Sequence, residues 1–184
     1  MNIIAAANKD TPGTGINEIL QAHYKTYGRS FFSRYDYEEV SSEGAKKLVD
    51  NLDQHLTNAS LKNVDYPTSF GENFTVADLT NFSYTDPIDG SVSKNQGHII
   101  QFTDGSRVVF RLSGTGSQGA TVRMYVERYT KDESQYTKET AEGLKGLIEV
   151  ALQITKLKEY LEREEPTVIT VSPFLLLSCP SGLG

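Results

Sequence analysis

Apolar side chains recur every three or four residues in several stretches of the chain, a spacing that predicts amphipathic helices. The second of these patterns stops at Gly28, a residue type that often ends a helix, and the third begins at a cap, Ser41 or Ser42. The expected helices cover residues 2–7, 16–27, 42–56 and 144–161. The first starts without a capping residue, which indicates the last turns of a helix.

Between residues 73 and 126 the pattern changes to short runs of β-branched and aromatic residues separated by turn-forming clusters at 86–90 and 103–106. This pattern predicts a small antiparallel sheet, with the helix over 144–161 lying across it. The expected fold class is therefore α+β, a two-layer antiparallel sheet with packed helices.

Residues 171–184 contain two prolines and follow no regular period, so we expect this tail to be disordered. Its apolar stretch at 174–177 is far shorter than the roughly 20 residues that cross a bilayer. No membrane span is expected.

Composition narrows the possible functions. The chain has 18 Lys+Arg against 24 Asp+Glu, a formal net charge of −6, which argues against a surface that binds nucleic-acid phosphates. The single cysteine, Cys179, excludes an internal disulfide and a multi-cysteine metal site, and this suits a reducing compartment. Residues 1–10 lack the basic region of a secretory signal, so we expect a cytoplasmic protein.

One stretch of the expected sheet indicates chemistry. If the strands flanking the segment 113–120 pair symmetrically about Ser117, Arg111 and Arg123 lie directly opposite one another. Like charges across a ladder are unfavourable unless an anion lies between them. The segment between the arginines holds Ser113, Thr115 and three glycines, among them Gly114 and Gly116, whose backbone N–H groups can turn inward to hold an anion.

Arginine's planar fork suits phosphate oxygens, so the predicted site is a phosphate pocket. The alternative is a flexible hairpin with two solvated arginines. The spacing Gly114-x-Gly116-x-x-Gly119 also matches a generic nucleotide-binding pattern, but a dinucleotide loop is followed by a helix, and here a strand is expected.

Other candidate residues point less clearly to chemistry. Asp86 and Asp89 can be read as metal ligands, but Asp-Pro and Asp-Gly pairs more often form turns. The three histidines, His23, His55 and His98, are scattered without a carboxylate or second histidine at ligand spacing, which favours surface or partly packed positions. Arg34 with residues 35–39 can either add a cationic or aromatic edge to a site or pack at a corner between domains.

The segment Arg111-Leu-Ser-Gly-Thr-Gly-Ser-Gln-Gly-Ala-Thr-Val-Arg123 resembles the phosphate-binding loop of phosphoglucomutases. Further segments resemble that family in the same order, and closely its parafusin branch. They are residues 29–40, 84–91, 102–107 and 166–170. The likeness runs from about residue 3 to Thr170.

The resemblance implies an α-D-phosphohexomutase, a four-domain enzyme that interconverts glucose 1-phosphate and glucose 6-phosphate through a phosphoserine, Mg²⁺ and glucose 1,6-bisphosphate. It implies that residues 1–28 are the end of the third domain and its connecting helix, and that 29–170 are the C-terminal, TATA-binding-protein-like domain that grips the substrate's nonreacting phosphate. Residues 171–184 are then an appended tail. The positions implied to bind phosphate are Arg111, Ser113, Gly114, Thr115, Gly116 and Arg123.

The chain departs from the family pattern in what it lacks. It has no Thr-Ala-Ser-His-Asn-Pro nucleophile loop, no Asp-Gly-Asp-Gly-Asp-Arg metal loop and no Gly-Glu-Glu-Ser-Phe-Gly sugar loop. We therefore assign it no catalytic and no metal-binding residue and expect it to be inactive alone. The alternatives are a noncatalytic, parafusin-like binding or regulatory module and, against the charge of −6, a nucleic-acid-binding protein.

Overall fold

The computed structural model describes residues 3–116 and 119–171 of the chain. The helices in these ranges are α1 (Ile3–Asp10), α2 (Ile16–Tyr27), α3 (Ser42–Asn58), α4 (Thr140–Thr155) and α5 (Leu157–Leu161), with a 3-10 turn at Glu133–Gln135. The strands are β1 (Arg29–Val40), β2 (Asp65–Pro67), β3 (Asn73–Thr85), β4 (Val92–Phe102), β5 (Arg107–Gly116), β6 (Gly119–Thr130) and β7 (Val168–Val171).

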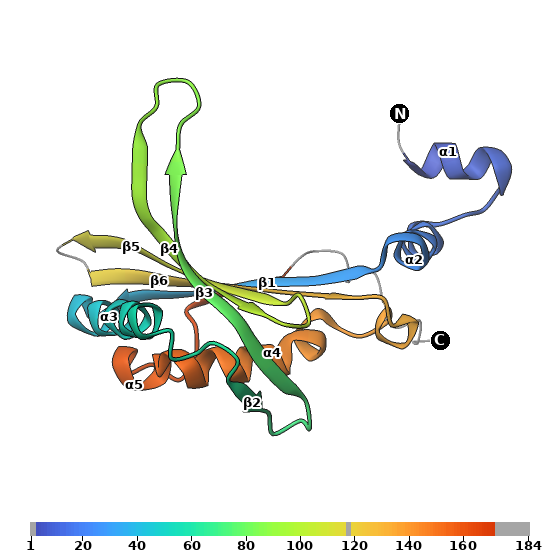
Figure 1. Cartoon of the computed structure of the whole chain (residues 1–184). Coiled ribbons are helices and arrows are strands. Elements are labelled where there is room, and N and C mark those ends of the chain that lie inside the picture. Colours follow the sequence, from blue (N-terminus) through green and yellow to red (C-terminus); the bar gives the residue numbers. More distant parts are fainter. Residues whose placement is uncertain (1–2, 117–118, 172–184) are drawn as a thin grey trace.

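Within the described ranges the strands form one antiparallel, curled sheet in the order β2-β3-β4-β5-β6-β1-β7. Helices α3, α4 and α5 cover one face of it, while α1 and α2 lie beyond one end of the sheet (Figure 1). The fold is therefore α+β with a sheet layer and a helix layer, as the sequence pattern predicts.

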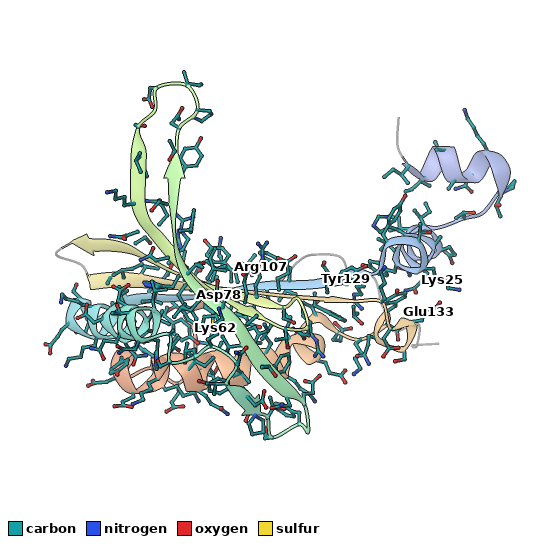
Figure 2. The ribbon with its side chains drawn as sticks, viewed as in Figure 1. Lys25, Lys62, Asp78, Arg107, Tyr129 and Glu133 are labelled. Atoms are coloured by element: carbon teal, nitrogen blue, oxygen red, sulfur yellow. The ribbon has the colours of Figure 1, made fainter. Side chains whose placement is uncertain are left out.

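The core lies between the sheet and the helix layer. Leu48 and Leu52 of α3 and Leu147 of α4 are fully buried against Met124 and Val108 of the central strands. Alternate residues of the central strands point to this side, so β6 and the described part of β5 each contribute one apolar face, as the period of two predicts. The opposite face is open, and Figure 2 shows Arg107 on that side of the sheet, away from the helices.

The expected helix over 144–161 is interrupted. It begins earlier, at Thr140, and α4 ends at Thr155 because Lys156 takes a left-handed backbone conformation (φ 50°), after which α5 continues the apolar stripe. A left-handed residue breaks the helical hydrogen-bond pattern. The stripe itself is unbroken in the sequence, so spacing alone does not reveal the break.

Strand β1 is absent from the elements that the sequence pattern predicts. Its residues alternate imperfectly, since Tyr35, Asp36 and Tyr37 are all buried. The strand is buried because it lies between β6 and β7, and its last residues contain an irregularity between Tyr37 and Val40. The motif at 29–40 thus forms an inner strand of the sheet.

The expected disordered tail overlaps the sheet by one residue. Val171 is the last residue of β7 and lies opposite Ser33 of β1. The remaining residues of that prediction, 172–184, lie outside the described residues. Among the described residues, every helix is too short or too polar to cross a bilayer.

Helix α2 is joined to the end of the sheet by contacts with the residues around Tyr129. The Tyr129 hydroxyl donates a hydrogen bond to the Tyr27 carbonyl oxygen over 2.5 Å, and Figure 2 shows Tyr129 at the end of the sheet near this helix. The ring of Tyr24 also lies 5.7 Å from that of Tyr136. Gly28 ends α2, as its position in the sequence predicts.

Candidate functional site

The hairpin of β5 and β6 carries the residues predicted to bind phosphate. Arg111 and Arg123 are direct partners across this ladder, which confirms the predicted register. The expected open loop over 113–120 is wrong in extent, however, because pairing continues through Thr115 with Ala120 and Gly116 with Gly119. The strands extend to Gly116 and from Gly119, and residues 117 and 118 lie outside the described residues.

A β-bulge allows the ladder to continue this far. The register shifts between Ser113 and Thr115, and the extra residue, Gly114, has φ 65°. Glycine adopts this left-handed conformation without steric cost, and a bulge leaves its extra residue out of the regular ladder. Gly114 is also exposed. Its backbone therefore lies at the surface and outside the regular ladder.

Gly119 fixes the other side of the hairpin. Its φ is 94°, and a Cβ atom there would lie 3.0 Å from the Val40 carbonyl oxygen and 3.3 Å from the Glu39 backbone. A side chain would thus push the hairpin away from the end of β1. The glycine permits a close approach between the outer end of the hairpin and the end of β1.

The two arginine side chains do not face one another. Arg111 extends across β4, where its Nε donates to the Gln96 carbonyl oxygen over 3.0 Å. This path exists because Gly97 has no side chain, since a Cβ there would lie 2.9 Å from Arg111 Cγ. Arg123 is held on the opposite flank, with its Nε 3.8 Å from Asp36 Oδ1.

This arrangement corrects the expectation of two guanidinium groups side by side. Their Cα atoms are paired, but each Nε lies toward a different neighbouring strand, which separates the two like charges. Within the described residues, neither arginine uses its terminal nitrogens in a hydrogen bond to the protein. Both forks are therefore available to a ligand above the hairpin base.

Two charged residues of β1, Arg34 and Asp36, lie beside Arg123, and Asp36 forms an ion pair with each arginine. The Asp36 side chain is only 4% exposed, and its Oδ2 lies 3.0 Å from Arg34 Nη2. The same Arg34 nitrogen donates to Thr170 Oγ1 over 3.3 Å. The segment thus packs within the sheet, between β6 and β7, and not at a corner between domains. That it adds an edge to a binding site stays a prediction.

A cavity of about 360 Å³ lies behind the hairpin, between α3 and strands β3 to β6. Its wall includes His98, which is 4% exposed and holds its Nε2 2.7 Å from Asp53 Oδ1. Packing of this histidine fits the prediction, but its carboxylate partner was missed because Asp53 lies 45 positions away in the sequence. Sequence spacing does not predict such long-range pairs.

Asp86 and Asp89 form the turn that their sequence predicts. Asp86 Oδ1 accepts from the Ile88 N–H over 2.7 Å, and Asp89 Oδ1 accepts from the Ser91 N–H over 2.8 Å. Hydrogen bonds from Ser91 also lower the pKa of Asp89. The described residues contain no group of three or more His, Cys, Asp or Glu side chains that could hold a metal ion.

Three kinds of comparison with known proteins agree. Residues 29–167 match the family model of the phosphoglucomutase-1 C-terminal domain. The chain is 47% identical to the chloroplastic phosphoglucomutase of Arabidopsis thaliana over 92% of its length and 46% identical to human phosphoglucomutase-1 over 84%. It is 44% identical over 92% of its length to the cytoplasmic phosphoglucomutase of Solanum tuberosum.

A solved structure has the same fold. The open form of the exocytosis-sensitive phosphoprotein pp63/parafusin, a phosphoglucomutase from Paramecium, matches 91% of this chain with a TM-score of 0.75 and 40% identity. The chain spans 27% of the length of that structure and of the Arabidopsis and human proteins, and 30% of the potato protein.

Proposed function

Since this chain belongs to the phosphoglucomutase family and matches its C-terminal domain, we propose that it grips the phosphate group of a phosphosugar with the hairpin of β5 and β6. The observation that carries this proposal is the pairing of Arg111 with Arg123 at the base of a glycine-containing hairpin. Two guanidinium forks and an exposed, bulged backbone offer a phosphate dianion both charge and directed N–H groups.

The proposed ligand set keeps the six positions found in the sequence. Arg111 and Arg123 turn their terminal nitrogens toward the phosphate oxygens, and the segment Ser113, Gly114, Thr115 and Gly116 supplies backbone donors. The proposal requires the two diverging side chains to turn toward one another when a phosphate binds, and an anion between them would offset the repulsion of the like charges.

The substrates proposed for the complete protein are glucose 1-phosphate and glucose 6-phosphate, with glucose 1,6-bisphosphate as intermediate. This chain carries none of the family's nucleophile, metal or sugar loops, so alone it should position a phosphate without transferring it. The described residues do not fit the Mg²⁺ that the family implies, because they contain no group of three or more His, Cys, Asp or Glu side chains that could hold it.

An NMR titration of the chain with glucose 6-phosphate tests the proposal. The Gly114 and Gly116 amide signals should shift with a dissociation constant near millimolar (roughly −4 kcal/mol), because one part of a cleft makes few contacts. The shifts should disappear when Arg111 and Arg123 are both replaced by Ala. Unmoved wild-type signals, or equal shifts in the double variant, would refute the phosphate site.

A parafusin-like binding module is a second candidate function, favoured by the 40% identity to parafusin. A pull-down with wild type and with the Arg111→Ala, Arg123→Ala variant distinguishes the two functions. A protein partner that stays bound to the variant would support the binding module. For the compartment we propose the cytosol, although relatives named cytoplasmic and chloroplastic both match the chain.

A further inference from the structure

Asp36 is a buried carboxylate at the edge of the arginine site. It lies directly opposite Arg123 in the ladder of β1 and β6, and Arg123 lies opposite Arg111 in the next ladder. We propose that Asp36 is a positioning residue for the phosphate site: it fixes Arg34, tethers Arg123 by its Nε, and sets the charge of the cluster. The inference rests on the proposed function, because it concerns how the same site is held ready.

Asp36 interacts more closely with Arg34 than with Arg123. Arg34 is locked, since one of its terminal nitrogens lies 3.0 Å from Asp36 Oδ2 and also donates to Thr170 Oγ1. Arg123 is only tethered, because 3.8 Å between its Nε and Asp36 Oδ1 is too long for a hydrogen bond. Arg123 can therefore turn toward a ligand without breaking a hydrogen bond to Asp36.

Several buried polar atoms around Asp36 lack a hydrogen-bond partner among the described residues. Within the described residues, Asp36 Oδ1, Arg123 Nε and Arg34 Nε are buried and have no hydrogen-bond partner. A buried donor and acceptor this close are stabilised when they move together, which requires only a small displacement of the Arg123 side chain. We expect the Nε of Arg123 to donate to Asp36 once its fork engages phosphate.

The charge of the cluster also depends on Asp36. Arg34, Arg111 and Arg123 carry three positive charges, and the carboxylate neutralises one of them. The two positive charges that remain balance the two negative charges of a phosphate dianion. Removal of the Asp36 carboxylate would raise the net charge of the cluster by one. A purely electrostatic account therefore predicts tighter anion binding, whereas a positioning role predicts weaker binding.

The two accounts predict opposite changes in phosphate affinity, so a titration distinguishes them. We would titrate the full chain with inorganic phosphate as wild type, Asp36→Asn, Asp36→Glu and Glu127→Gln. Glu127 is the control for charge, because this β6 carboxylate, like Asp36 on β1, pairs with an arginine: its Oε2 lies 2.6 Å from Arg107 Nη2. It makes no ion pair with Arg34, Arg111 or Arg123. Its substitution changes the net charge of the protein by the same amount as Asp36→Asn.

The positioning role predicts that Asp36→Asn weakens phosphate binding about tenfold despite the added charge, since misplaced donors lose much of their value. Asp36→Glu should lie between it and wild type, and Glu127→Gln should bind at least as well as wild type. If Asp36→Asn binds phosphate as tightly as wild type or more tightly, the inference is wrong while the proposed function stands. If wild type itself does not bind, the proposed function fails first.

A spectroscopic measurement covers the case in which Asp36→Asn does not fold. In the wild-type chain, phosphate should move the Nε–Hε signal of Arg123 and leave that of Arg34 nearly unchanged, because Arg34 is already locked. Equal movement of the two signals, or none at Arg123, would overturn the inference.

Discussion

Arg111 and Arg123 are paired across adjacent strands, yet their side chains are held by opposite neighbours, Gln96 on β4 and Asp36 on β1. Two positive groups fixed on one short hairpin gain from separating when nothing lies between them. A dianion between them reverses this preference. Under the proposed function the two arginines act as a clamp, and within the described residues their terminal nitrogens make no hydrogen bond to the protein.

Gly97 should be needed for the Arg111 arm of this clamp. A Cβ at position 97 would lie 2.8 Å from the Phe110 carbonyl oxygen and 2.9 Å from Arg111 Cγ, so the Gly97→Ala variant must displace the arginine. We expect phosphate binding to weaken about tenfold. Titration of the folded variant checks this, and wild-type affinity together with an unchanged Arg111 Nε–Hε signal would contradict it.

Binding should depend on pH through the ligand. The second pKa of a phosphate monoester is about 6, so glucose 6-phosphate loses one negative charge as the pH falls through that value, while arginine stays charged. The affinity should decline below about pH 6. Glucose 6-sulfate, whose charge does not change there, is the control, and a parallel decline for both ligands would place the titrating group in the protein.

The sequence predicts the register of the β5–β6 hairpin better than it predicts the contacts around that hairpin. The Arg111–Arg123 register follows from counting residues along one hairpin, which is a local relation. The contacts of Asp36 with Arg123 and of Asp53 with His98 join distant segments, and no periodicity encodes them. Strand β1 escaped prediction because Asp36, a charged residue, is buried beside Tyr35 and Tyr37 and hides the alternation.

The helices show the same difference between what local sequence predicts and what distant contacts determine. The apolar stripe over 144–161 predicts which residues are buried, and Leu144, Leu147 and Leu161 are. It does not predict the left-handed Lys156, since neither glycine nor proline marks the break. Local backbone choices of this kind are set by how α4 and α5 fit against the sheet and α3.

The helix layer should provide much of the stability. Leu147→Ala removes a fully buried side chain and should lower the free energy of unfolding by about 3 kcal/mol. Ile88→Ala is the matched control, because that side chain is 94% exposed at the tip of the β3–β4 hairpin and should change stability by less than about 0.5 kcal/mol. Chemical denaturation measures both, and equal effects would contradict the assigned core.

His55 should make stability depend on pH. Burial, with a smaller contribution from the charge of Lys156, lowers its pKa below the usual 6.5. The unfolded chain therefore binds a proton more readily, and the contribution of His55 is fully present above pH 6.5 and is lost as the pH falls through the lowered folded-state value. Measurements of the free energy of unfolding of wild type and His55→Gln between about pH 5.5 and 7.5, roughly one unit on either side of the usual histidine value, should show a shallower pH dependence for the variant. Parallel curves would exclude this role.

A crystal structure of the chain with glucose 6-phosphate tests the central claim most directly. We predict the phosphate group above the base of the β5–β6 hairpin, with terminal nitrogens of both Arg111 and Arg123 at about 2.7–2.9 Å from its oxygens. A phosphate bound elsewhere, or both guanidinium groups still turned to Gln96 and Asp36 with the ligand present at saturating concentration, would contradict the claim.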